Sequence, residues 1–192
     1  MQLTELLARL DADGLLLLTD AKFPSVVALS AGGPVKSSWW SHPRGKEIYG
    51  LLLKFVEHED VLCVKLLDGK VTFVHRHLWP AVLSIARAKE AWQMKGLSKP
   101  ARALLGRVDD EGEIEAHGAA VKELELRLLV HANQVHAKSG AHALVLTGWN
   151  RWAKKHGPLG RKISLDSAKQ ALCTVVDGLN ELHGSKAKLP FK

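Results

Sequence analysis

The chain has 192 residues, of which 46% are hydrophobic and 24% charged, and its formal net charge at pH 7 is +7. This length and composition are typical of a globular protein with one large domain or two small ones, and they argue against a disordered or fibrous chain. The sequence contains neither an N-terminal signal pattern nor an apolar stretch of about 20 residues, so we expect a cytoplasmic protein that does not enter a membrane.

The first third of the chain predicts two helices around a short apolar segment. Residues 3–10 form an amphipathic pattern, with Thr4 as a candidate N-cap and residues 11–14 as the stop. Residues 15–18 are continuously apolar, and periodicity cannot distinguish a strand from a helical turn at that length. Residues 43–58 have apolar side chains at spacings of three and four, which predicts a helix.

A β-hairpin is the strongest local prediction. The runs VLCVKLL and KVTFVHR have strand-like composition and are separated by Asp68 and Gly69. An Asp-Gly pair favours a type I′ turn, in which both central residues have positive φ. We therefore expect an antiparallel hairpin over residues 61–76.

The rest of the chain is predicted to be mainly helical. Ser98 is a good N-cap for a helix that tolerates Pro100 in its first turn, and Gly184 would end the last long helix. The expected elements are a helix over residues 79–92, a helix from residue 98, an acidic turn over 109–118, a long helix over 119–135, a strand over 142–149, a helix around 149–152, a helix over 164–183 and a loose tail.

These elements predict an α+β fold that is mainly helical, with one prominent antiparallel hairpin and flanking helices. A boundary near residue 97 would divide the chain into a helical and hairpin unit (residues 1–96) and a second helical unit (residues 97–192). The alternative is a single compact domain. Two isolated cysteines, each inside an apolar run, favour reduced buried thiols over a disulfide.

The positive charge is concentrated in two segments. Residues 36–107 hold 13 basic and 6 acidic residues together with four of the six tryptophans, and residues 149–162 hold five basic residues and no acidic one. Basic clusters interleaved with aromatic residues favour nucleic acid as a partner, because they supply phosphate contacts and stacking surfaces. The alternative is an ordinary solvated surface. The expected DNA-contacting residues are Trp40, Arg44, Lys46, Lys65, Lys70, Arg76, Arg151, Lys154, Lys155, Arg161 and Lys162.

The adjacent pair Trp39 and Trp40 allows two interpretations. Consecutive residues on a strand point to opposite faces, so one indole would fill the core while the other stays near the surface and could stack on a base. Alternatively both indoles are in the core.

The histidines raise the question of a metal site. His75 and His77 are two residues apart, which on a strand places both on one face, and a third ligand could come from His42, His58 or a carboxylate. The favoured interpretation is that the two histidines make hydrogen bonds or contact phosphate, so we expect no metal and no cofactor. The sequence has no P-loop, no GxGxxG after a strand and no GxSxG. If the protein is an enzyme, its weak catalytic candidates are His42, His75 and His77.

The second half of the chain resembles winged-helix DNA-binding domains. The resemblance is carried by LSKPARALLGRVDDEGEIEAHG and by KELELRLLVHANQVHAKSGAHALVLTGW, in which helical segments precede a strand and a basic Trp segment. Among winged-helix proteins it is most similar to the bacterial DNA glycosylases that unhook interstrand crosslinks, and it covers about a third of the chain. Those enzymes use a Gln-x-Gln motif, whereas Gln93 and Gln134 are isolated here, so no catalytic residue is carried over.

The sequence therefore predicts a DNA-binding protein, and the resemblance implies a setting in DNA repair. One alternative is an enzyme that acts on nucleic acid or nucleotides near Trp40, His42, Arg44, His75 and His77. A second alternative is a protein-interaction module that uses exposed tryptophans.

Overall fold

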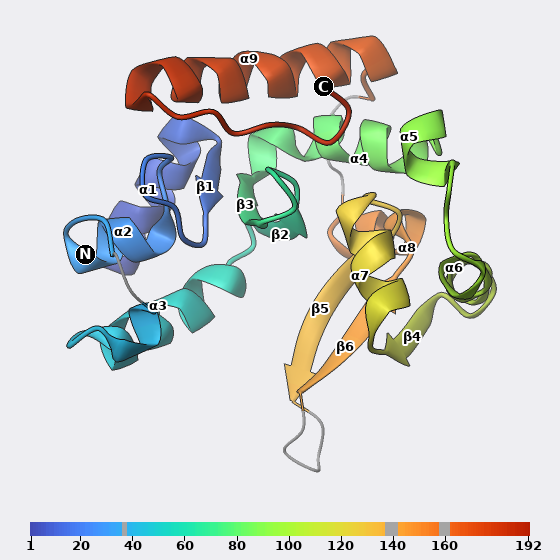
Figure 1. Ribbon diagram of the computed structural model, residues 1–192, viewed down its shortest axis with the longest axis horizontal. Coiled ribbons are helices and arrows are strands. Elements are labelled where there is room, and N and C mark those ends of the chain that lie inside the picture. Colours follow the sequence, from blue (N-terminus) through green and yellow to red (C-terminus); the bar gives the residue numbers. More distant parts are fainter. Residues whose placement is uncertain (36–37, 137–141, 158–161) are drawn as a thin grey trace. The chain divides into compact units, whose positions relative to one another are not determined.

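The computed structural model divides the chain into two compact units (Figure 1). The first unit contains residues 1–79, 169–190 and 192, and the second contains residues 80–168 and 191. This division differs from the predicted boundary near residue 97, because the chain leaves the first unit earlier and returns to it at its C-terminal end. The structure describes every residue except 36–37, 137–141 and 158–161, and the side chains of 134–136 and 142–143 are also left undescribed.

The first unit contains a three-stranded antiparallel sheet. Its strands β1 (Leu15–Leu17), β2 (Val61–Lys65) and β3 (Val71–His75) lie in the order β1-β3-β2. Between β2 and β3, Asp68 and Gly69 have φ values of 50° and 69°, and Lys70 N donates to Leu67 O over 2.8 Å. These features match the predicted turn, so the hairpin is confirmed. Pairing of β1 with β3 resolves the ambiguous apolar run as a strand.

Helices cover this sheet and build its core. The elements are α1 (Leu3–Asp13), α2 (Val26–Ala31), the 3₁₀ turn η1 (Trp39–Ser41), α3 (Gly45–Val56) and the 3₁₀ turn η2 (Arg76–Leu78). The helix α1 begins with a reciprocal capping box between Gln2 and Glu5, rather than at the predicted Thr4. The core cluster of buried side chains consists of Leu6, Leu10, Leu16, Val26, Phe55, Val61 and Phe73.

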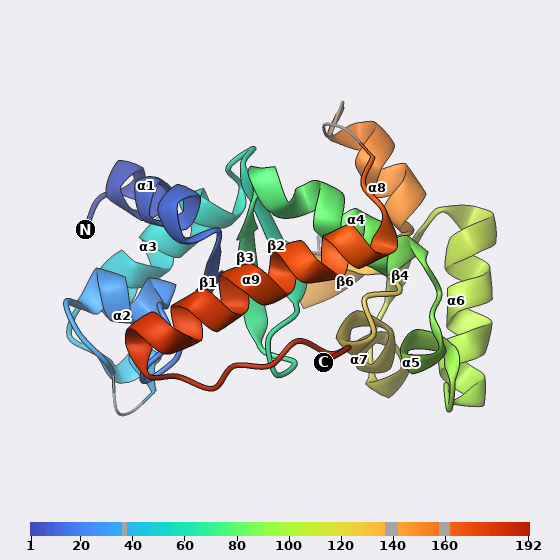
Figure 2. The ribbon, with the colours of Figure 1, turned by 90° about the horizontal axis from the view of Figure 1, so that it is seen from above.

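The C-terminal helix α9 (Leu165–His183) joins the first unit from residue 169 onward. Ser164 Oγ accepts from Ser167 N and so caps the start of this helix, close to the predicted start at residue 164. The chain then folds back along the helix (Figure 2). Asn180 Nδ2 donates to Ala187 O, and Asn180 Oδ1 accepts from Ala187 N. Lys188 O accepts from Asp68 N over 2.9 Å. The expectation of a loose tail is therefore wrong.

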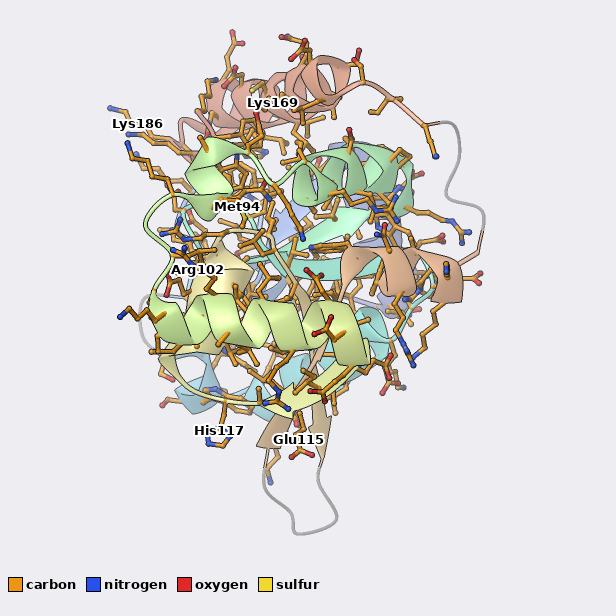
Figure 3. The ribbon with its side chains drawn as sticks, turned by 90° about the vertical axis from the view of Figure 1, so that its right-hand side faces the viewer. Met94, Arg102, Glu115, His117, Lys169 and Lys186 are labelled. Atoms are coloured by element: carbon orange, nitrogen blue, oxygen red, sulfur yellow. The ribbon has the colours of Figure 1, made fainter. Side chains whose placement is uncertain are left out.

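The second unit contains another three-stranded antiparallel sheet. Its strands β4 (Glu113–Ala116), β5 (His131–His136) and β6 (His142–Thr147) lie in the order β4-β6-β5. The helices are α4 (Trp79–Arg87, in this unit from Pro80), α5 (Ala91–Met94), α6 (Lys99–Glu111), α7 (Ala119–Leu126) and α8 (Trp149–Lys155). The helix α6 lies in the foreground of Figure 3, and its N-cap Ser98 accepts from Ala101 N as predicted.

Three predicted boundaries in this unit are wrong. The predicted helix over residues 119–135 ends at Leu126, because Leu128 takes a φ of 52° and the chain enters β5, which pairs with β6. The predicted helix over residues 79–92 breaks at Lys89, whose φ is 49°. The acidic stretch predicted as a turn instead ends α6 and forms β4, which pairs with β6.

Together the described elements form an α+β fold with a mainly helical content, as predicted. The strands β5 and β6 form a second antiparallel pair in addition to the predicted hairpin. Across the described parts of the chain, no helix combines the length and the apolar content that crossing a bilayer requires.

Candidate functional site

An exposed aromatic surface lies at the start of α3. The rings of Trp39 and Trp40 stack with centroids 4.0 Å apart and an interplanar angle of 25°, and Trp40 also contacts Tyr49 at 5.1 Å. Trp40 remains 61% exposed, and Trp39 is half-buried. The pair lies on η1 rather than on a strand, so the two indoles lie against one another instead of on opposite faces. We call Trp39, Trp40 and Tyr49 the aromatic platform.

The basic residues beside the platform differ in how their charges are used. Arg44 Nε donates to Glu47 Oε2 over 2.8 Å, and its Nη1 donates to Ser30 O over 3.0 Å. Its guanidinium is therefore partly committed to holding α3 in place. Lys46, two residues further along, is exposed on the first turn of α3. His42 Nδ1 accepts from Arg44 N over 3.2 Å, which is a structural role in the turn.

A second cluster forms where β3 ends. His75 is the last residue of β3 and His77 lies in η2, yet their Nδ1 atoms are 2.7 Å apart. Asp11 Oδ1 lies 3.4 Å from His75 Nδ1 and 3.8 Å from His77 Nδ1. The predicted proximity of the histidines is confirmed, although the turn η2 produces it rather than an extended strand. We call these three residues the Asp-His-His cluster.

Gly14 brings α1 against the end of β3. With a φ of 74° it ends α1, and its carbonyl accepts from His75 N over 2.9 Å. A Cβ at this position would lie 2.9 Å from Leu78 Cδ1 and 3.3 Å from His77 Nε2. Glycine is therefore required both by the backbone conformation and by the close approach of His77.

The charges around this cluster favour a neutral imidazole at His75. Partial burial lowers its pKa, and the nearby His77 lowers it further, while Asp11 and Asp60 act in the opposite direction. Arg76, between the histidines, lies 3.8 Å from Asp60 and stacks over the Trp79 ring at 5.6 Å. Arg76 is thus held by contacts within the protein.

The two lysines of the hairpin have different surroundings. Lys70 Nζ lies 2.8 Å from Asp20 Oδ2. Burial raises the pKa of Asp20, but the bonds from Lys70 and from the Lys22 and Phe23 backbones outweigh it and leave the pKa below its usual value. The positive charge of Lys70 is therefore largely balanced. Lys65 is half-buried on β2.

The basic segment of the second unit lies on α8. Trp149 and Trp152 are both buried, and Trp149 Nε1 donates to Leu128 O over 2.8 Å. These two indoles therefore anchor the helix. Lys154 and Lys155 are exposed at its last turn, and Arg151 lies 3.6 Å from Glu113.

The remaining predicted contacts lie beyond α8. Lys162 is exposed, whereas Arg161 falls outside the described residues. Among described residues, the structure thus brings part of the predicted set together in three places: the aromatic platform with Arg44 and Lys46, the Asp-His-His cluster, and α8. Lys65, Lys70 and Lys162 lie outside these places.

Asp11 is the member of these clusters that the sequence did not reveal. It was assigned to the stop of the first helix, 64 positions before His75. The pairing of Leu15 with Val74 in the β1–β3 ladder brings the residues preceding β1 next to those following β3. That pairing is a long-range feature, so no local pattern could have indicated the carboxylate.

Comparison with known proteins gives no relative from which a role could be transferred. No protein-family model, no curated protein and no solved structure matches the chain. The functional argument therefore depends on the geometry of the described residues.

Proposed function

We propose that this protein binds DNA in the cytoplasm and that it prefers segments whose bases are unpaired. The observation that carries the proposal is the aromatic platform, in which Trp40 is 61% exposed although it is braced by Trp39. A bare indole of this kind is costly to leave in water, and it offers a flat surface on which a base can stack.

The bracing of Trp40 favours stacking for an entropic reason. Contacts with Trp39 at 4.0 Å and with Tyr49 at 5.1 Å restrict the ring before a ligand arrives. Less conformational freedom is then lost on binding. Stacking on an aromatic residue contributes about 1–3 kcal/mol per base and requires a base that is not already stacked in a duplex.

The exposed lysines supply the second component of the proposal. Lys46 lies near the platform on α3, and Lys154 and Lys155 extend from a helix whose tryptophans are buried. No described residue forms an ion pair with these three lysines, so within that part of the chain they can approach a phosphate backbone without breaking one. Each phosphate that is neutralised releases counterions, so binding weakens as salt increases.

The winged-helix resemblance is consistent with this proposal. In the second unit, α7 precedes the paired strands β5 and β6, and the sheet order is β4-β6-β5. A helix followed by a hairpin is the arrangement with which winged-helix domains contact DNA. A role in DNA repair belongs to the same proposal and follows from that resemblance. Cys63 and Cys173 are thiols rather than halves of a disulfide in the described structure, which is in keeping with a reducing compartment.

The test is fluorescence anisotropy with labelled oligonucleotides of one sequence in three forms: single-stranded, fully paired, and paired with a central unpaired bubble. Each form is titrated at two salt concentrations while tryptophan emission is followed. We expect tighter binding to the single-stranded and bubble forms, weaker binding at the higher salt, and quenching of tryptophan emission. Absence of binding at low salt would refute the proposal, and equal affinity for all three forms without quenching would refute the preference for unpaired bases.

A further inference from the structure

The Asp-His-His cluster of the first unit has the donor set of a transition-metal site. Two imidazole nitrogens and one carboxylate oxygen converge from α1, β3 and η2. Nitrogen and oxygen donors in this combination suit Zn²⁺ and its neighbours in the first transition row, whereas Mg²⁺ and Ca²⁺ prefer oxygen donors alone.

The distances between the three donor atoms fit a single ion. His75 Nδ1, His77 Nδ1 and Asp11 Oδ1 form a triangle with sides of 2.7, 3.4 and 3.8 Å. The point in the plane of this triangle that is equally distant from all three donor atoms lies about 2.0 Å from each of them. Zinc binds nitrogen and oxygen at about 2.0–2.2 Å, so this point lies at about the bonding distance from each of the three atoms.

The fold holds the three donor atoms near this position. The two Nδ1 atoms are at hydrogen-bonding distance, so one of them carries a proton that a metal ion would displace. The backbone bond between His75 and Gly14 fixes the end of β3 against the end of α1. Donors of a tetrahedral zinc ion lie roughly 3.3 Å apart, so the two Nδ1 atoms, now 2.7 Å apart, must separate by a few tenths of an ångström on binding.

The cluster is also accessible. The side chains of Asp11 and His77 are 68% and 47% exposed, so an ion can enter from solvent. Three protein ligands leave at least one coordination position for water or for a substrate oxygen, which is the pattern of catalytic rather than structural zinc sites. We propose that Asp11, His75 and His77 form an open binding site for one Zn²⁺ ion.

The experiment uses the full chain after treatment with a chelator. Co²⁺ is added first as a spectroscopic probe, and its visible absorption is followed to saturation. Zn²⁺ is then titrated into the Co²⁺ form. We expect saturation at one equivalent, complete displacement by Zn²⁺, and no displacement by millimolar Mg²⁺.

Three variants separate this site from binding to other histidines. Asp11→Asn and His77→Ala alter exposed side chains and should each weaken Zn²⁺ binding at least tenfold, because each removes or weakens a metal bond. His117→Ala is the matched control: its side chain points outward from the second unit (Figure 3), and its substitution should leave the affinity unchanged. Circular dichroism of the metal-free forms verifies that all three are folded.

The outcomes decide the proposal in either direction. One-equivalent binding that is weakened in both Asp11→Asn and His77→Ala supports it. Failure to bind Zn²⁺, or binding of equal strength in Asp11→Asn and the unaltered protein, overturns it. DNA binding is measured separately, so either proposal can fail without the other.

Discussion

Trp40 lies with its ring stacked on that of Trp39, at a centroid distance of 4.0 Å, and yet it leaves 61% of its surface in solvent. Three of the six tryptophans, Trp79, Trp149 and Trp152, are buried instead. Trp40 is thus held in place by aromatic neighbours while one side of its ring stays available, and this relationship leads to the first prediction.

Replacing Trp40 by alanine should weaken binding of single-stranded DNA by about 5-fold to about 150-fold. The range follows from about 1–3 kcal/mol for stacking of one base. Trp40→Tyr keeps an aromatic face and should retain most of the affinity. Leu182→Ala removes another exposed apolar side chain, 72% exposed on α9, and serves as the control. Anisotropy titrations at one salt concentration measure all three, and an unchanged affinity in Trp40→Ala would exclude the platform as the base-contacting surface.

Removing the two lysines at the end of α8 should reduce the salt dependence of DNA binding. The slope of log K against log salt is negative. If Lys154 and Lys155 each neutralise one phosphate, the magnitude of this slope should be smaller by about 1.4–1.8 in the double alanine variant. Lys70→Ala should have a smaller effect, because Lys70 is paired with Asp20 at 2.8 Å. Titrations at four salt concentrations give the slopes. Equal slopes for the double variant and the unaltered protein would place the phosphate contacts elsewhere.

Two glycine-to-alanine substitutions should have opposite effects on the free energy of unfolding. Gly14→Ala should destabilise the first unit by about 1–3 kcal/mol, because Gly14 has a φ of 74° and its added Cβ would lie 2.9 Å from Leu78 Cδ1. Gly50→Ala should stabilise by about 0.5–1 kcal/mol, because Gly50 is inside α3 with nothing within 4 Å of the added Cβ. Urea unfolding measures both values, and a shared sign would contradict the assigned conformations.

Stability should fall as the pH falls from about 6.5 to about 4, with His131 as one cause. Burial lowers the pKa of His131 to about 4, and His156 and Lys155 add to that effect. The His131 ring packs near two indoles, with centroid distances of 5.8 Å to Trp149 and 5.7 Å to Trp152. Between these pH values the unfolded chain binds a proton that the folded protein excludes, so the contribution is complete above about pH 6.5 and is lost toward pH 4.

The loss attributable to this one histidine is at most about 3 kcal/mol, since one pKa unit corresponds to about 1.4 kcal/mol. Urea unfolding of the unaltered protein and of His131→Leu, measured from pH 4 to pH 7.5, gives the comparison. The variant should show a flatter dependence on pH in this window. If both curves run parallel, another group is responsible for the pH dependence.

Local signals in the sequence predicted a substantial part of the fold. Asp68 and Gly69 specified the hairpin turn, and Ser98 specified the start of α6 through its bond from Ala101 N. The last helix was indicated by its apolar periodicity, together with Ser164 before it and Gly184 after it. Each of these signals acts over a few residues, so it has the same meaning in any tertiary context.

The predicted elements that proved wrong lie where contacts with distant segments determine the backbone conformation. Apolar residues at helical spacing continue to Leu128 and beyond, but the chain there turns and pairs with β6, where His131 lies opposite Thr147. Strand pairing between distant segments outweighed the local preference for helix. The backbone around Arg127 is likewise held by distant partners, since its Nη1 donates to the carbonyls of Trp92, Gln93 and Lys95.

The candidate sites divide along the same line. The sequence by itself determined that His75 and His77 are close, that basic residues and tryptophans are clustered, and that the fold is mainly helical with a hairpin. Only the tertiary structure decided that Trp40 is the exposed member of its pair, that Asp20 balances Lys70, and that Asp11 completes the Asp-His-His cluster. The physical reason is that spacing along a helix, turn or strand is set by bond geometry between near neighbours. Exposure, ion pairing and the convergence of side chains depend instead on which distant segments pack together.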